Sequence, residues 1–197
     1  MIPTPSREQV HTRLTFVCAG ATAATKAAAF PHDEPLETRS LAAVAELARH
    51  AGVSGRVLSS PSLAARQTAE ILSRDAGEDE ALADWNCGRW AGRQLADLEE
   101  KEPEAVALWL SDPGAAPHGG ESLVGLFGRV GSWLDACNGG ERRIVAVTHA
   151  AIIRAAVVTC LGAPLQSFWR LDVRPLSVTE LRGDGKRWRI RSFGAAS

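Results

Sequence analysis

The chain has 197 residues, of which 45% are hydrophobic and 23% charged, with 22 basic against 23 acidic side chains. This is the composition of an ordinary globular protein, and it excludes collagen, coiled coil and disorder. The formal net charge is −1, with both signs spread along the chain, so we expect no surface for nucleic acid or membrane. We expect a single domain over residues 1–197, because a chain of this length buries enough surface to form a core without disulfides or metals.

The cysteine pattern gives no metal signature. The chain has neither a CxxC pair nor a Cys/His cluster of zinc-finger spacing, although it contains four cysteines, at positions 18, 87, 137 and 160. The N-terminal residues lack the apolar stretch of a signal peptide, and the longest apolar run is too short to span a membrane. We therefore expect a cytoplasmic protein with reduced thiols, no cofactor and no metal.

The first half of the chain predicts two strand–helix units. Residues 14–17 form a short apolar run typical of a buried strand, and Ser40 precedes a helical pattern of apolar residues over 41–48. Residues 56–58 indicate a second strand, after which Pro61 opens a helix in its first turn.

Residues 76–120 are rich in glycine and proline and are expected to be mostly loop. This stretch holds three of the six tryptophans, Trp85, Trp90 and Trp109. Long segments of this kind between regular elements often form the wall of a pocket, and we expect Trp85 and Trp90 to line a cleft.

The second half of the chain continues the alternation. An amphipathic helix is predicted from Glu121, a strand at 144–147 leads into a helix at 151–161, and a hairpin closes the chain at 178–181 and 188–190. Strands that alternate with helices predict a three-layer α/β/α sandwich around a mostly parallel central sheet.

Two strand ends carry residues suited to ligand binding. The first predicted strand runs into residues 18–22, and the strand at 144–147 runs through Thr148 into His149 at the start of a helix. Ligands of open α/β sheets bind outside the carboxyl ends of the strands, where helix N-terminal amides attract anions. We expect the site at this edge of the sheet.

Taken together, six segments resemble the histidine phosphatase superfamily, the branch that includes phosphoglycerate mutases and small-molecule phosphatases. They follow the family's order over about residues 13–192: LTFVCAGAT at 14–22, DEPL at 33–36, SSPSLAARQTAE at 59–70, LADWNCGRWAG at 82–92, HGGES at 118–122 and VAVTHAAIIR at 145–154. The resemblance implies a phosphoglycerate mutase-like fold. It also implies, as the parental activity, hydrolysis of a small phosphomonoester, with mutase transfer less favoured.

The resemblance also shows where this chain departs from its family. The first strand in the family ends in Arg-His-Gly, whose histidine becomes phosphohistidine, whereas this chain has Cys18, Ala19 and Gly20. A second family arginine, four residues before the threonine of QTA, is replaced by Ala64. The nucleophile and both arginines of the phosphate pocket are therefore absent.

Other positions of the family's site are kept or nearly so. The resemblance makes Asp84 the general acid, in place of the usual glutamate, and makes His149 the residue that stabilises the transferring phosphoryl group. Thr22 matches a family threonine that contacts the ligand, although its hydroxyl is equally suited to cap a local turn. Ala150 is expected to bind substrate through the first turn of its helix.

Alanine has no lone pair, so residue 19 cannot form phosphohistidine, and loss of a nucleophile in another enzyme class costs about 10⁶-fold in kcat. We therefore expect this chain to be inactive, or nearly so, as a phosphatase. Three interpretations of Ala19 stay open: an engineered inactivating substitution, a natural non-catalytic binding protein, or a pocket rebuilt for a less charged substrate. The parent family is enzymatic, but whether this chain is an enzyme stays open.

Cys18 allows two further hypotheses. Cys18, His149 and Asp84 are the residue types of a nucleophile, base and orienter set, and the same three could ligate a soft metal. The alternative is a small buried thiol that fills the space of the missing arginine.

The remaining polar and aromatic candidates are expected outside the chemistry. We expect His32 on the surface, Lys26 as a solvated loop residue, Arg154 as chiefly structural and Trp169 in the core or an interface. His118 is a candidate for the pocket rim. The partner is expected to be a small phosphomonoester or a related ligand, and a homodimer stays open.

Overall fold

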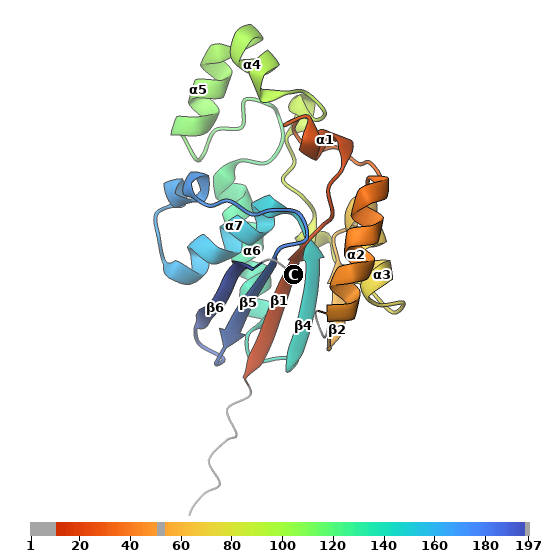
Figure 1. Ribbon diagram of the computed structural model, residues 1–197. Helices are drawn as coiled ribbons and strands as arrows, with labels where there is room; N and C mark the ends of the chain where they lie inside the picture. The colour runs from red at the N-terminus through yellow and green to blue at the C-terminus, as the bar shows by residue number, and fades with distance from the viewer. Residues whose placement is uncertain (1–10, 51–53, 196–197) are drawn as a thin grey trace, which may run out of the picture.

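A computed structural model describes residues 11–50 and 54–195 and contains a six-stranded sheet in the order β3-β2-β4-β1-β5-β6 (Figure 1). The first four strands in this order pair in parallel, whereas β5 is antiparallel to both β1 and β6. The expected α/β class with a mostly parallel sheet is confirmed. The strands are β1 (Thr12–Cys18), β2 (Arg56–Ser59), β3 (Gly77–Glu78), β4 (Arg143–Thr148), β5 (Val178–Gly183) and β6 (Trp188–Ala195).

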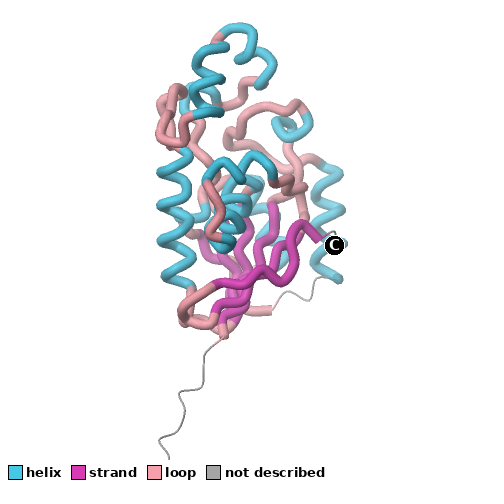
Figure 2. The backbone as a smooth tube through the Cα atoms, turned by 90° about the vertical axis from the view of Figure 1, so that its left-hand side faces the viewer, coloured by secondary structure: helices cyan, strands magenta, loops and turns pink. Residues whose placement is uncertain are grey.

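Helices cover both faces of the sheet (Figure 2), with α2 and α3 packed against each other on one side and α6 and α7 on the other. The helices are α1 (Ala23–Lys26), α2 (Thr38–His50), α3 (Leu63–Leu72), α4 (Leu95–Lys101), α5 (Pro103–Ser111), α6 (Leu123–Cys137) and α7 (Ala150–Leu161). Three short 3₁₀ helices join them: η1 (Glu80–Leu82), η2 (Gly88–Trp90) and η3 (Leu165–Arg170).

The alternation of side chains along β1 divides the core between the two faces. Leu14, Phe16 and Cys18 are buried in the cluster that includes α6 and α7. Val17 and Ala19 are buried in the cluster on the side of α2 and α3. Cys18 and Ala19 are therefore neighbours in sequence that belong to opposite layers at the end of β1.

The register of the parallel strands aligns their carboxyl ends. Cys18 of β1 pairs with Thr148 of β4, and Ser59 of β2 pairs with Val147 of β4. Because the three strands end at nearly the same level, the residues that follow them emerge side by side.

Helix starts differ from the predicted ones by one to three residues. Helix α2 begins before Ser40, so Ser40 lies inside the helix rather than at its N-cap. Helix α3 is capped by Ser62 rather than opened by Pro61, and the helix predicted from Glu121 begins at Leu123. In both α3 and α6 a serine hydroxyl accepts an amide of the first turn, which a hydrophobic pattern alone does not reveal.

The segment 76–120 is more regular than predicted. It contains β3, η1, η2, α4 and α5, and the last two helices rise beyond the carboxyl ends of the strands (Figure 1). Helices α4 and α5 are only 7 and 9 residues long, and they share Glu102 as the C-cap of one and the N-cap of the other. Helices this short carry little hydrophobic periodicity, so the glycines and prolines of the surrounding segment dominated the sequence pattern.

Candidate functional site

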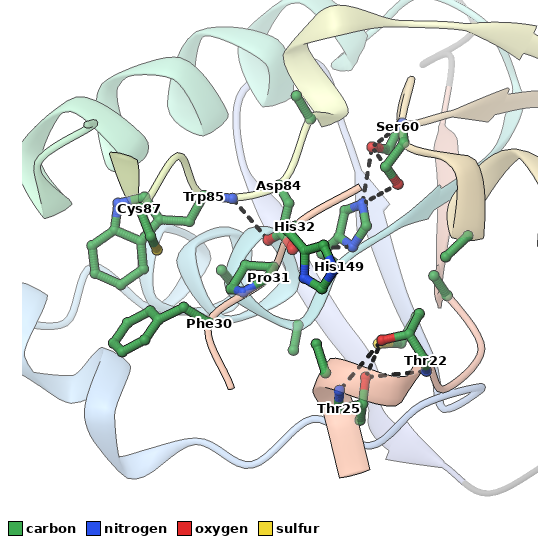
Figure 3. Close-up of a pocket in the computed structure, with 18 of the residues that line it drawn as sticks. Thr22, Thr25, Phe30, Pro31, His32, Ser60, Asp84, Trp85, Cys87 and His149 are labelled. Carbon is green, nitrogen blue, oxygen red and sulfur yellow. Dashed lines mark hydrogen bonds and ion pairs between the residues drawn. The ribbon is translucent and has the colours of Figure 1, made fainter. Parts of the chain in front are cut away.

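A cavity of about 610 Å³ opens at the carboxyl ends of β1, β2 and β4 (Figure 3). Its position agrees with the edge of the sheet that the sequence indicated. The predicted site residues all line it, namely Cys18, Ala19, Gly20, Thr22, Ala64, Asp84, His149 and Ala150. The topology therefore brings together positions that are separated by up to 132 residues, from residue 18 to residue 150.

His149 lies between a carboxylate and two hydroxyls (Figure 3). Its Nδ1 is 3.3 Å from Oδ2 of Asp84. Its Nε2 is 2.9 Å from the hydroxyl of Ser62 and 2.9 Å from that of Ser60. Both ring nitrogens therefore have partners within the protein.

Asp84 is held in place by the backbone around it. Its Oδ1 accepts a hydrogen bond from the amide of Trp85 at 2.7 Å, which leaves Oδ2 facing His149. The indole N–H of Trp85 in turn donates to the carbonyl of Glu121 at 2.7 Å. The carboxylate is thus oriented before any ligand arrives.

Cys18 and Cys87 are buried thiols in the cavity wall. Burial, and after it the nearby charge of Asp84, raises the pKa of each thiol to about 12. Within the described chain, His149 forms its hydrogen bonds to the two serines and none to Cys18. Cys18 therefore fits the description of a buried thiol that fills space better than that of an activated nucleophile.

The rest of the cavity floor is apolar at positions where the resemblance to the histidine phosphatase superfamily implies charged groups. Ala19 and Ala64 are 6% and 5% exposed, and both line the cavity. Arg154 is the only arginine or lysine among the described residues around it. Its guanidinium carbon lies 5.6 Å from the ring centre of Phe168.

Carboxylates outnumber that arginine. Asp33, Glu34 and Asp84 all line the cavity, and Glu34 lies 3.6 Å from the imidazole of His32. Asp33 accepts the amide of Leu63 at 2.7 Å. The electrostatic character of the pocket is therefore unfavourable for a multiply charged anion.

Tryptophans form one wall of the cavity. Trp85 and Trp109 stack with ring centres 5.3 Å apart, and Trp109 meets Trp169 edge-on at 4.7 Å. Phe30 also packs edge-on against Trp109 at 5.4 Å. The predicted role of Trp85 is confirmed by its place in the wall, whereas Trp90 is fully buried behind Trp109 and does not line the cavity.

Three residues that we expected elsewhere also line the cavity: His32, Arg154 and Trp169. His32 and Trp169 belong to loop and 3₁₀ segments that fold over the strand ends, and Arg154 lies one turn into α7, so its side chain reaches back toward the same opening. The sequence did not indicate that His32 and Trp169 line the cavity, because their loop and 3₁₀ segments carry no periodic pattern.

Other predicted candidates have structural roles. His118 is buried, its Nδ1 accepts the amide of Gly120 at 3.0 Å, and burial lowers its pKa. Lys26 is exposed and paired with Glu37. Thr22 combines both roles considered for it, because it lines the cavity and its hydroxyl caps α1.

Backbone N–H groups at two helix starts face this region without acceptors. Helix α7 begins at Ala150, and its N-cap His149 provides no side-chain cap. Among the described residues, the amides of Ala150 and Ala151 have no hydrogen-bond acceptor, and the same holds for Ala64 in the first turn of α3. Such amides provide ready donors for a developing negative charge.

Sequence reasoning did not identify Ser60 and Ser62 as site residues. Both follow β2 directly, in the SSPS run, and the available signal was their position after a strand that neighbours β4. Across residues 11–50 and 54–195, no three His, Cys, Asp or Glu side chains are placed to hold a metal ion. No helix in those ranges is long and apolar enough to cross a membrane.

A family model described as the histidine phosphatase superfamily (branch 1) matches residues 14–196. The chain is 32% identical over 152 residues to the Bifunctional protein Rv2228c of Mycobacterium tuberculosis, a match that covers 73% of this chain and 42% of that relative. It is 28% identical to Phosphoserine phosphatase 1 of Hydrogenobacter thermophilus, over 64% of this chain and 61% of the relative. The chain therefore spans less than two thirds of the length of either relative.

Solved structures show the same architecture. The structure of mycobacterial glucosyl-3-phosphoglycerate phosphatase Rv2419c in complex with VO₃ superposes with a TM-score of 0.81 at 26% identity, covering 94% of this chain and 100% of that one. Vanadate is a phosphate-like anion, so that relative binds such an anion within the shared fold.

Proposed function

This chain belongs to the histidine phosphatase superfamily, and from that premise we propose that its pocket binds an uncharged small molecule with an aromatic part and does not hydrolyse phosphomonoesters through phosphohistidine. The observation that carries the proposal is the cavity floor. Ala19 occupies the nucleophile position, and Cys18 and Ala64 occupy the two arginine positions, all three lining the cavity as buried, uncharged residues.

The charges around the cavity support the same proposal. Phosphoryl transfer is catalysed mainly by positioning and by positive groups that neutralise the transferring oxygens. Here one guanidinium, that of Arg154, shares the cavity with the carboxylates of Asp33, Glu34 and Asp84. A phosphomonoester dianion would gain little from this arrangement and would face repulsion from the three acidic groups.

Shape and lining support a neutral aromatic ligand. A cavity of about 610 Å³ lies within the range of small-molecule sites, roughly 300–1,000 Å³. Trp169 is partly exposed in the cavity wall, and a second ring that packs on it adds about 0.5–1.5 kcal/mol beyond area burial. Trp85 and Trp109 are only 6% and 7% exposed and hold Trp169 in place through the stacked and edge-on contacts. Specific orientation then falls to the few polar groups around His149.

Binding tests the first half of the proposal. Isothermal titration calorimetry would compare 2-acetonaphthone, a neutral aryl ketone, with orthovanadate. We expect the ketone to bind and vanadate not to bind. Replacing Trp169→Ala should weaken ketone binding by about fivefold, since one aromatic pair is worth about 1 kcal/mol. Phe193→Ala, on the exposed face of β6, is the matched control and should change nothing.

Turnover tests the second half. We expect no hydrolysis of a phosphomonoester panel by the unaltered chain or by Ala19→His, because Cys18 and Ala64 still replace the arginines. The triple variant Cys18→Arg, Ala19→His, Ala64→Arg should bind vanadate, because these three residues of the cavity floor set its preference. Turnover by the unaltered chain that is lost in His149→Ala would overturn the proposal, as would a gain of 10³-fold or more by Ala19→His alone.

A further inference from the structure

We propose that Ser62, His149 and Asp84 act as nucleophile, general base and orienting carboxylate in the hydrolysis of a neutral carboxylic ester. This inference rests on the proposed function, because it assigns an uncharged ester to the pocket described above. The set is neither the phosphohistidine site of the family nor a thiol site on Cys18. Ser62 and His149 come together only in the folded chain, because they follow the neighbouring strands β2 and β4.

Three side chains come together here: a hydrogen bond joins Ser62 to His149, and the carboxylate of Asp84 lies close enough to the same ring to pair with it. The hydroxyl of Ser62 is 2.9 Å from Nε2 of His149, and Nδ1 of the same ring is 3.3 Å from Oδ2 of Asp84. Nucleophile and base within about 2.6–3.2 Å, with the base oriented by a third group, is the geometry of an activated serine. Contacts of this kind are often looser before substrate binds.

The other hydrogen bonds set the direction of each proton. The hydroxyl of Ser62 accepts the amide of Ala65 at 3.4 Å, which leaves its own proton free for Nε2 of His149. The carboxylate oxygen of Asp84, 3.3 Å from Nδ1, favours the tautomer with the proton on Nδ1, so the Nε2 lone pair faces the serine. Trp85 holds the second oxygen of that carboxylate through its amide. Every member is therefore oriented for proton transfer from Ser62 to His149.

Burial distinguishes Ser62 from Ser60, whose hydroxyl lies at the same 2.9 Å from Nε2. Ser60 is completely buried, whereas Ser62 is partly exposed in the cavity wall. The hydroxyl of Ser60 also accepts the amide of Ser62 at 3.3 Å, so it supports the backbone of its neighbour. Ser62 is the hydroxyl that a ligand reaches.

The unpaired amides of Ala64, Ala150 and Ala151 add hydrogen-bond donors to the nucleophile, base and carboxylate. They lie at the first turns of α3 and α7, which also position Ser62 and His149 as their N-caps. Two helix N-termini thus place free donors and positive ends of their dipoles beside the nucleophile. A carbonyl oxygen that becomes an oxyanion requires donors of this kind.

The reaction balances without any co-reactant other than water. The Ser62 oxygen forms a bond to the ester carbonyl carbon, its proton moves to Nε2 of His149, and the carbonyl electron pair moves onto oxygen. Collapse breaks the carbon–alkoxy bond, and the leaving alkoxide takes the proton from His149. Water then attacks the acyl-serine, gives a proton to His149, and collapse returns that proton to Ser62, with a carboxylic acid released.

The test combines a covalent probe with turnover. An alkyl fluorophosphonate transfers its phosphoryl group to an activated serine, with loss of fluoride and of the serine proton, and the adduct is mapped by mass spectrometry. Hydrolysis of 2-naphthyl acetate is followed by release of 2-naphthol. We expect one adduct, on Ser62, and ester hydrolysis by the unaltered chain.

Variants are chosen to keep the fold. Ser62→Asn removes the nucleophile but retains a side chain that caps α3. It should abolish the adduct and lower kcat by about 10⁶-fold, as loss of the nucleophile does in a serine protease. Asp84→Asn should lower kcat with little change in KM, because the amide has the shape of the carboxylate in the cavity lining but disturbs the tautomer of His149. Ser60→Ala should still yield the adduct on Ser62.

The outcomes separate this inference from the proposed function. If 2-acetonaphthone binds but neither the adduct nor hydrolysis is found, the serine inference is wrong and the binding function stands. An adduct on Ser60 would also overturn the assignment, as would hydrolysis that persists in Ser62→Asn. If the ketone does not bind and phosphomonoesters are hydrolysed instead, the proposed function itself is wrong.

Discussion

Arg129 of α6 fastens the segment that carries Asp84. Its Nη1 donates to the carbonyls of Ala81 and Ala83, each at 2.9 Å, just before Asp84 in the chain. Its Nε and Nη2 donate to the two carboxylate oxygens of Glu121, at 3.0 and 2.7 Å. Nη2 also donates to the carbonyl of Asp84 at 3.5 Å, so one side chain satisfies three carbonyls of the site loop and one carboxylate.

Replacing Arg129→Met keeps most of the aliphatic stem and removes all five hydrogen bonds. The side chains of Arg129 and Glu121 are 23% and 19% exposed, so the pair is largely shielded from water. Breaking a buried pair by removing one partner costs about 3–5 kcal/mol, and partial exposure places this case near the lower end. We expect a loss of about 3 kcal/mol in the free energy of unfolding, which corresponds to a fall in Tm of roughly 6–12 °C for a chain of this size.

Urea and thermal unfolding measure this loss directly. Arg174→Met is the matched control, because Arg174 and its partner Asp172 are 84% and 78% exposed and 3.8 Å apart. An exposed ion pair contributes at most about 1 kcal/mol to the free energy of unfolding, so the loss in Arg174→Met should be near zero. A loss below about 1 kcal/mol for Arg129→Met, or an equal loss for both variants, would refute the reasoning.

Three further predictions concern the thiol, a glycine and a buried histidine. Because burial raises the pKa of Cys18 from 9.0 to about 12, iodoacetamide at pH 8 should modify it at least about 10³-fold more slowly than an ordinary thiol, and a rate matching glutathione would contradict this. Gly88→Ala should lower the free energy of unfolding by at least about 2 kcal/mol, because φ is +48° and the added carbon would lie 2.2 Å from the carbonyl oxygen of His118. Gly128→Ala is the control and should lower it by nothing, because the added carbon meets open space. Burial lowers the pKa of His118, so the unfolded chain binds its proton more readily and stability should fall as pH drops below about 6.5, a dependence that His118→Asn should flatten in urea titrations.

Much of the fold was predictable from the sequence because its signals are local. The apolar runs at β1 and β4 predicted buried strands, and the residues at their ends predicted the position of the cavity. Ala19 and His149 were placed by their spacing within motifs, and both line that cavity. The same locality explains the failure at 76–120, where α4 and α5 are too short to show a period.

The chain by itself determined which chemistry is absent: a methyl group at position 19 and uncharged residues at both arginine positions follow from identity alone. Only the tertiary structure decided what surrounds His149. Ser62 is 87 residues away in the chain and meets it because β2 pairs with β4 in a register that sets Ser59 opposite Val147. Strand order and register depend on the packing of all layers together, so no spacing in the sequence encodes that a serine after one strand reaches the imidazole after another.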